Sequence, residues 1–131
     1  MSRYLLDTST LIDFSKGRQP VESRLLALIA AKETIAVSAI SVAEFYAGIP
    51  PALHEQWRQF FAALDYWNAS HDAAIQAGRF IFDYARQGRV LSTTAALLAA
   101  VALEHDAVVV TDNAKDFPMP EVQLLSLRAE Q

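Results

Sequence analysis

Residues 107–113 read Ala-Val-Val-Val-Thr-Asp-Asn and contain the clearest β-strand signal in the sequence. An unbroken apolar run rich in β-branched residues is typical of a strand that is buried on both faces. The run ends at Thr111, Asp112 and Asn113, which are polar residues of the kind that form turns. The stretch therefore predicts a central strand of a sheet, with polar side chains at its carboxyl end.

Outward from this strand, short apolar runs alternate with segments of helical periodicity along the whole chain. Such alternation predicts one α/β domain, residues 1–131, with three α/β/α layers and a short, mainly parallel central sheet flanked by helices. Ser70 is the expected N-cap of the longest helix, and Thr93 or Thr94 that of the next helix. The other expected strands cover residues 3–6, 34–37, 65–68 and 122–125. The expected helices cover residues 8–14, 20–32, 41–47, 53–64, 70–87 and 93–105.

The composition excludes several classes of protein. The 131 residues include no cysteine, so disulfides and thiolate zinc sites are impossible. An acid at position 7 interrupts the N-terminal apolar stretch too early for a signal peptide, and we expect a cytoplasmic protein without a membrane span. The net charge of −4 argues against binding nucleic acid by phosphate neutralisation alone. Acids gathered around a metal ion would account for that charge, because the cation can attract phosphate.

Four acids lie near the predicted carboxyl edge of the sheet. Asp7 follows the first strand, Glu44 lies in the helix after the second, and Asp112 and Asp116 follow the strand at 107–110. Ligands of open parallel sheets bind at this edge. Converging carboxylates repel one another unless a cation lies between them, and Mg²⁺ prefers such oxygens. The four acids therefore predict a Mg²⁺ or Mn²⁺ site that could support phosphodiester cleavage.

Each acid also has a simpler interpretation. Ser41 and Glu44 have the spacing of a capping box, in which Glu44 would bind a backbone N–H at the start of its helix. Asp112 could be a turn residue or an N-cap, and Asp116 a solvated turn residue. Asp7 is harder to explain in this way, since an acid at the end of a buried strand needs a partner or a ligand.

Four segments together resemble the sequence blocks of PIN domains, in the order of that family. They are L-L-D-T-S at residues 5–9, S-A-I-S-V-A-E at 38–44, L-S-T-T-A-A-L-L-A-A-V-A at 91–102 and V-T-D-N-A-K-D-F at 110–117. The length and pattern are most similar to VapC, the toxin of type II (VapBC) toxin–antitoxin pairs. The resemblance implies a PIN fold. It also implies that the catalytic metal ligands are Asp7, Glu44 and Asp112, with Asp116 as an additional ligand. By the same resemblance, the polar residues that orient ligands or contact substrate are Thr8, Ser9 and Asn113.

The third block departs from the family pattern at one position. Ala95 stands where the family usually has an acid. The resemblance implies a metal-dependent endoribonuclease that cleaves RNA, forms homodimers and binds a VapB-type antitoxin. Because Ala95 replaces the acid, we predict that the RNA cleavage is impaired. The alternative is a catalytically inactive PIN-fold module that engages antitoxin or RNA.

Other signals are weaker. The three histidines have no ligand spacing, and a haloacid-dehalogenase-like site would need an acid where the chain has Ser9. Arg79, Arg86 and Arg89 could line an RNA groove or form a solvated helix face.

Overall fold

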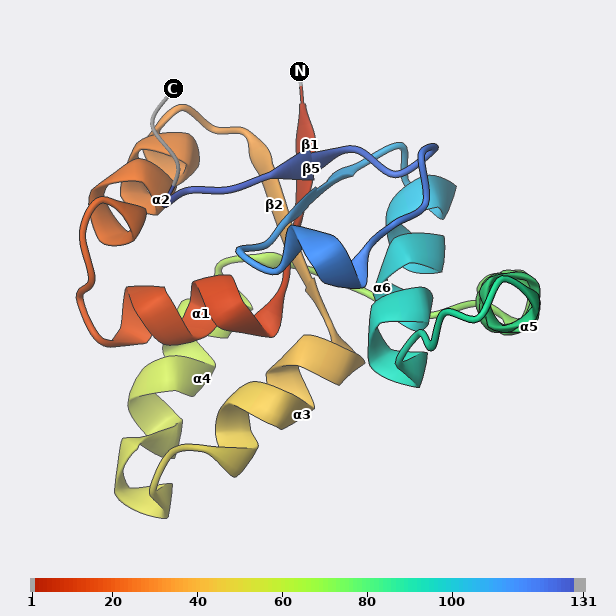
Figure 1. Ribbon diagram of the computed structural model, residues 1–131. Coiled ribbons are helices and arrows are strands. Elements are labelled where there is room, and N and C mark those ends of the chain that lie inside the picture. The colour runs from red at the N-terminus through yellow and green to blue at the C-terminus, as the bar shows by residue number, and fades with distance from the viewer. Residues whose placement is uncertain (1, 129–131) are drawn as a thin grey trace.

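The protein has a parallel five-stranded sheet, as expected. The computed structural model describes residues 2–128, and the strand order is β3-β2-β1-β4-β5 with every neighbouring pair parallel (Figure 1). The chain builds the sheet outward from β1 in one direction through β2 and β3, and then in the other direction through β4 and β5. The strands are β1 (Arg3–Leu6), β2 (Thr34–Ser38), β3 (Asp65–Trp67), β4 (Val108–Val110) and β5 (Leu124–Leu125).

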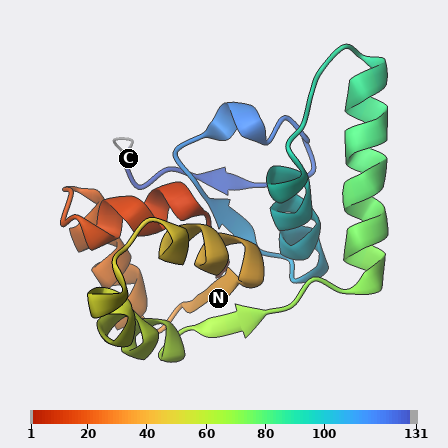
Figure 2. The ribbon, with the colours of Figure 1, turned by 90° about the horizontal axis from the view of Figure 1, so that it is seen from below.

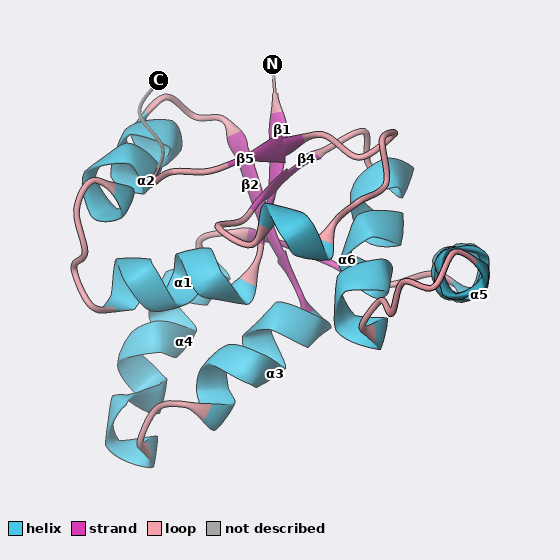
Figure 3. Cartoon of the chain, viewed as in Figure 1, coloured by secondary structure: helices cyan, strands magenta, loops and turns pink. Residues whose placement is uncertain are grey.

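Helices cover both faces of the sheet, which confirms the three-layer α/β/α fold. Helices α5 and α6 lie on one side and α1 to α4 on the other, as Figures 1 and 3 show and as Figure 2 shows from below. No helix within residues 2–128 is long and apolar enough to cross a membrane. The helices are α1 (Thr8–Ser15), α2 (Val21–Ala30), α3 (Ala39–Ala47), η1 (Pro51–Leu53), α4 (His54–Ala62), α5 (His71–Arg86), α6 (Thr93–Glu104) and η2 (Ala114–Asp116).

The alternation of side chains along the strands divides the core in two. Leu5 and Val109 pack against α5 and α6, while their neighbours Leu6 and Val110 pack among the helices of the opposite face. All four side chains are fully buried. Helix α6 contributes mainly alanines to the first core, which lets its backbone lie close to the sheet. The aromatic residues Trp57, Phe60 and Phe61 of α4 pack against the second core.

Two expected helix starts are wrong. Helix α3 begins at Ala39 rather than Ser41, because β2 runs directly into it at Ser38. Helix α6 is capped by Ser92, whose Oγ accepts a hydrogen bond from the backbone N–H of Ala95 at 3.1 Å, so the expected caps Thr93 and Thr94 lie inside its first turn. Ser70 does cap α5, as predicted, and accepts a hydrogen bond from Ala73.

The topology determines where a ligand can bind. Strands β1 and β4 lie side by side, yet the chain leaves them in opposite directions across the sheet. The segments that follow them therefore separate and leave an opening at their carboxyl ends, which is where open α/β sheets bind ligands. Asp7 follows β1 and residues 111–116 follow β4, so the predicted site residues flank this opening.

Candidate metal and active site

Asp7 is held rigidly between β1 and α1. Its backbone N–H donates to the carbonyl of Val110 on the neighbouring strand at 3.0 Å, and its side chain caps α1. Oδ1 accepts a hydrogen bond from the backbone N–H of Thr8, and Oδ2 accepts one from Thr111 Oγ1, both at 2.7 Å. Both carboxylate oxygens thus have a fixed orientation at the opening.

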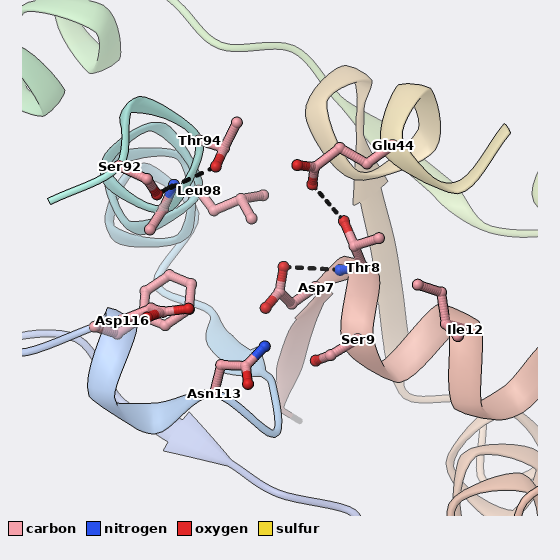
Figure 4. A pocket seen from close by; sticks show the side chains of 12 residues that line it. Asp7, Thr8, Ser9, Ile12, Glu44, Ser92, Thr94, Leu98, Asn113 and Asp116 are labelled. Atoms are coloured by element: carbon pink, nitrogen blue, oxygen red, sulfur yellow. Dashed lines mark hydrogen bonds between the residues drawn. The ribbon is translucent and has the colours of Figure 1, made fainter. Parts of the chain in front are cut away.

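Glu44 reaches the same opening from α3. Its Oε1 accepts a hydrogen bond of 2.6 Å from the hydroxyl of Thr8 (Figure 4). The capping-box interpretation is wrong, because α3 begins at Ala39 and Glu44 lies in its second turn. Ser41 is buried inside that helix and donates to the carbonyl of Ser38 instead. Glu44 is therefore free of a structural role at the helix start.

The segment after β4 sends its two acids in different directions. Asp116 and Asn113 line the same opening as Asp7, and Asp116 lies across it from Glu44 (Figure 4). Asp112 does not line it: its carboxylate forms a salt bridge with Arg128 and accepts a hydrogen bond from Ser126 Oγ at 3.3 Å. Asp116, rather than Asp112, thus lines the same cavity as the other two acids.

The opening is a cavity of about 310 Å³ with an acidic wall. Sequence reasoning missed Ser92 and Thr94, which the first turn of α6 brings to the cavity, and whose hydroxyls lie 3.2 Å apart. Their place in the third sequence block, next to Ala95, was the available signal. The cavity is lined by Asp7, Thr8, Ser9, Ile12, Glu44, Ser92, Thr94, Ala95, Leu98, Asn113, Asp116 and Phe117.

Burial and two neighbouring acids act on the carboxyl group of Asp7. Burial raises the pKa of Asp7 above its ordinary value, and the negative charges of Glu44 and Asp116 raise this pKa further. The hydrogen bonds from Thr111 and Thr8 act in the opposite direction without cancelling the rise. A divalent cation in the cavity would reverse this repulsion, since it favours the ionised carboxylates.

Ala95 forms part of the cavity wall with a methyl group. Its side chain is buried, and it occupies the first turn of α6, beside the acidic wall.

As the side chains stand, residues 2–128 contain no group of three or more acids and histidines able to hold a metal ion. Asp7, Glu44 and Asp116 supply oxygen donors of the type that Mg²⁺ and Mn²⁺ prefer, and they leave room for water ligands. The donor chemistry therefore fits a hard divalent cation, with fewer protein ligands than the resemblance implies.

A cluster of ion pairs links Arg128 to α1 and to the segment that follows β4. Asp13 of α1 is buried, and its carboxylate binds Arg18 at 2.9 Å and Arg128 Nε at 2.7 Å. Arg128 also binds Asp112, so it links α1 to the segment that follows β4. Hydrogen bonds from Arg128 are the main cause that lowers the pKa of Asp13, and Arg18 lowers it further.

We predict that replacing Arg128 with Gln lowers the free energy of unfolding by about 1–2 kcal/mol at pH 7. The folded-state pKa of Asp13 lies below its ordinary value of 3.8. The ion pair therefore stabilises the fold above pH 3.8, and this contribution is lost as the pH falls through the folded-state pKa. Urea unfolding at pH 7 and at about pH 3 measures the difference.

The matched control is the variant Arg58→Gln, which removes an exposed ion pair with Glu55. This variant should change the stability little at either pH. An equal loss of stability at both pH values in Arg128→Gln would show that packing, and not charge, accounts for the effect.

Comparisons with known proteins agree with this architecture. The PIN domain family matches residues 4–119. "Ribonuclease VapC19" of Mycobacterium tuberculosis is 31% identical over 120 residues, which cover 91% of this chain and 96% of that protein. The solved VapBC2 of Rickettsia felis bound to a promoter DNA fragment superposes with a TM-score of 0.79 and 25% identity, covering 94% of this chain and 97% of that one. A toxin–antitoxin complex from Klebsiella pneumoniae gives a TM-score of 0.75 and 27% identity, with 93% and 95% covered. With its sequence blocks, sheet order and acidic cavity at the expected edge, the chain belongs to the PIN-domain family.

Proposed function

We propose that this protein is a metal-dependent endoribonuclease toxin of a VapBC-type toxin–antitoxin pair, and that it cleaves RNA phosphodiester bonds at the acidic cavity. The observation that carries the proposal is that Asp7, Glu44 and Asp116 line one cavity between the carboxyl ends of β1 and β4. Relatives that span nearly the whole chain are ribonucleases of the VapC kind. The activity of the chain itself is expected to be low, because Ala95 leaves the cavity with one carboxylate fewer.

Mg²⁺ or Mn²⁺ is the cofactor that the cavity suits, with Asp7, Glu44 and Asp116 as its protein ligands. When bound, such an ion activates a water molecule and stabilises the charge that develops on a phosphodiester. The chain itself orients the ligands: Thr111 and Thr8 fix the carboxylate of Asp7, and Thr8 also holds Glu44. Asn113 lines the cavity, where its amide can donate a hydrogen bond to a phosphate oxygen.

The proposed partners follow from the relatives. The Rickettsia felis and Klebsiella pneumoniae structures are complexes of a toxin with its antitoxin. We therefore propose that this chain binds a VapB-type antitoxin and, like the proteins it resembles, forms homodimers.

A second candidate function is a catalytically inactive module that binds antitoxin or RNA without cleaving it. The observation in its favour is the methyl group of Ala95 in the cavity wall. The two functions differ in whether RNA is cut when Mg²⁺ or Mn²⁺ is present and left intact when EDTA removes the metal.

The test of the proposed site compares Asp116 with Asp112 in the Ala95→Asp protein, freed of any co-purified antitoxin. Asp116→Asn should slow Mn²⁺-dependent RNA cleavage by about 100-fold, because it removes a donor from the cavity. Asp112→Asn should change the rate by less than about fivefold, because its carboxylate binds Arg128 outside the cavity. Cleavage is measured on total RNA with Mn²⁺ and with EDTA. A larger loss from Asp112→Asn would show that this acid moves into the site.

A further inference from the structure

A second cavity opens directly beside the acidic one. It has a volume of about 440 Å³ and lies between the connection from α5 to α6 and the η2 turn. Ser92 and Asp116 line both cavities, so the two are adjacent. The remaining lining residues are Arg89, Val90, Leu91 and Lys115.

The second cavity is built by a direct contact between two distant segments. The guanidinium of Arg89 donates a hydrogen bond to the backbone carbonyl of Lys115. This bond holds the two basic residues together in the lining of the cavity. Leu91 is buried beneath them and anchors the connection to the core, whereas Val90 is 92% exposed at the rim.

The charge of this cavity is opposite to that of its neighbour. Within residues 2–128, the salt bridges to carboxylates involve Arg18, Arg58 and Arg128. Arg89 and Lys115 form none with any carboxylate of these residues. In a chain of net charge −4, two unneutralised cations at the border of an acidic cavity create a local attraction for anions. Val90 adds an exposed apolar group, which can contact the face of a nucleobase.

We propose that the Arg89–Lys115 cavity binds a phosphate of single-stranded RNA whose neighbouring nucleotide lies in the acidic cavity. This inference rests on the proposed ribonuclease function and assigns it a binding subsite. The acidic cavity repels a polyanion, so the binding strength of the strand must come from cations outside this cavity. Arg89 and Lys115 supply that attraction where the strand passes Ser92.

The other arginines considered from the sequence do not share this position. Arg79 and Arg86 lie on α5 and line neither cavity, and the guanidinium of Arg86 lies over the ring of Phe82, 5.5 Å from the ring centroid. Of the three, only Arg89 lies beside the acidic cavity. The pair Arg79 and Arg86 is therefore a matched control of equal charge.

The experiment measures binding of a fluorescein-labelled single-stranded RNA of about ten nucleotides by fluorescence anisotropy, in EDTA and at several salt concentrations. The double variant Arg89→Gln, Lys115→Gln should bind the RNA about tenfold more weakly at low salt. The slope of the logarithm of the association constant against the logarithm of the salt concentration should also become shallower, by about 0.7 for each phosphate that is no longer neutralised. Arg79→Gln, Arg86→Gln should keep most of the affinity and the slope. Lys115→Gln alone leaves the Arg89 hydrogen bond intact and should give an intermediate weakening.

Equal weakening in the two double variants would overturn the proposal, because it would show a general effect of net charge. Unchanged binding in Arg89→Gln, Lys115→Gln would also overturn it. Cleavage by the Ala95→Asp protein is assayed separately. If that protein does not cleave RNA while binding still depends on Arg89 and Lys115, the nuclease function fails and the subsite stands.

Discussion

The Ala95→Asp variant should cleave RNA at least about 100-fold faster than the chain itself in the presence of Mn²⁺ or Mg²⁺. The side chain at position 95 lies in the wall of the cavity that Asp7, Glu44 and Asp116 also line. An added carboxylate there would bring the number of acidic donors around the cavity to four. A hard cation binds more tightly as the number of carboxylate ligands rises.

The fold should tolerate this acid. Position 95 is the third residue of α6 and follows the Ser92 cap, so an acid there has the spacing of a capping box. The N-terminal turn of a helix also favours negative charge. The cost is repulsion from the acids already present, and we expect the metal-free variant to have a lower melting temperature than the chain itself. Mn²⁺ should raise the melting temperature of the variant more than that of the chain.

The measurement is the initial rate of RNA cleavage by both proteins with Mn²⁺ and with EDTA. Ala95→Asn is the matched control, because it has nearly the shape of Asp without the charge, and it should cleave no faster than the chain. Equal rates for Asp and Ala at position 95 would contradict the prediction. If neither protein cleaves RNA, the inactive binding module becomes the better interpretation.

The sequence was sufficient for the fold because each local signal agreed with its neighbours. The run at 107–110 became β4 and was buried between two helical layers, as its β-branched residues predicted. Asp7 could be placed at the carboxyl edge because it directly follows β1. In both cases the position depends on residues adjacent in sequence, and a parallel sheet then aligns the strand ends.

Sequence reasoning was less successful where a distant contact decides the direction of a side chain. Asp112 and Asp116 lie close together along the chain, and either could have faced the cavity. The choice depends on Arg128, which binds Asp112 and is brought there by the C-terminal segment. The Ser41 to Glu44 spacing was ambiguous in a similar way, since the capping box requires a helix start at Ser41 and β2 leads into α3 before that residue. Local patterns do not contain this information.

Replacing Asp7 with Asn in the Ala95→Asp protein should have opposite effects on activity and stability. Cleavage should fall by at least about 100-fold, because Asp7 is the most rigidly held of the proposed metal ligands. The metal-free protein should become more stable at neutral pH, because the ionised carboxylate of Asp7 is disfavoured by burial and by the charges of Glu44 and Asp116. Asn can still cap α1 and accept the hydrogen bond from Thr8.

The pH dependence separates this charge effect from a change in packing. The folded-state pKa of Asp7 is raised above 3.8, so its charge costs no stability well below pH 3.8. The free energy of unfolding falls as the pH rises from 3.8 towards the folded-state pKa, and the full loss is present above that pKa. The gain in melting temperature from Asp7→Asn should therefore be present at about pH 7 in EDTA and should shrink towards about pH 3.5. Added Mn²⁺ should reduce the gain, since it stabilises the protein that retains Asp7 more than the variant that lacks this ligand. A variant that is less stable at neutral pH in EDTA would contradict this account, because it would mean that the hydrogen bonds of Asp7 outweigh the repulsion it experiences. Such a result would make Asp7 a structural acid first and a metal ligand second.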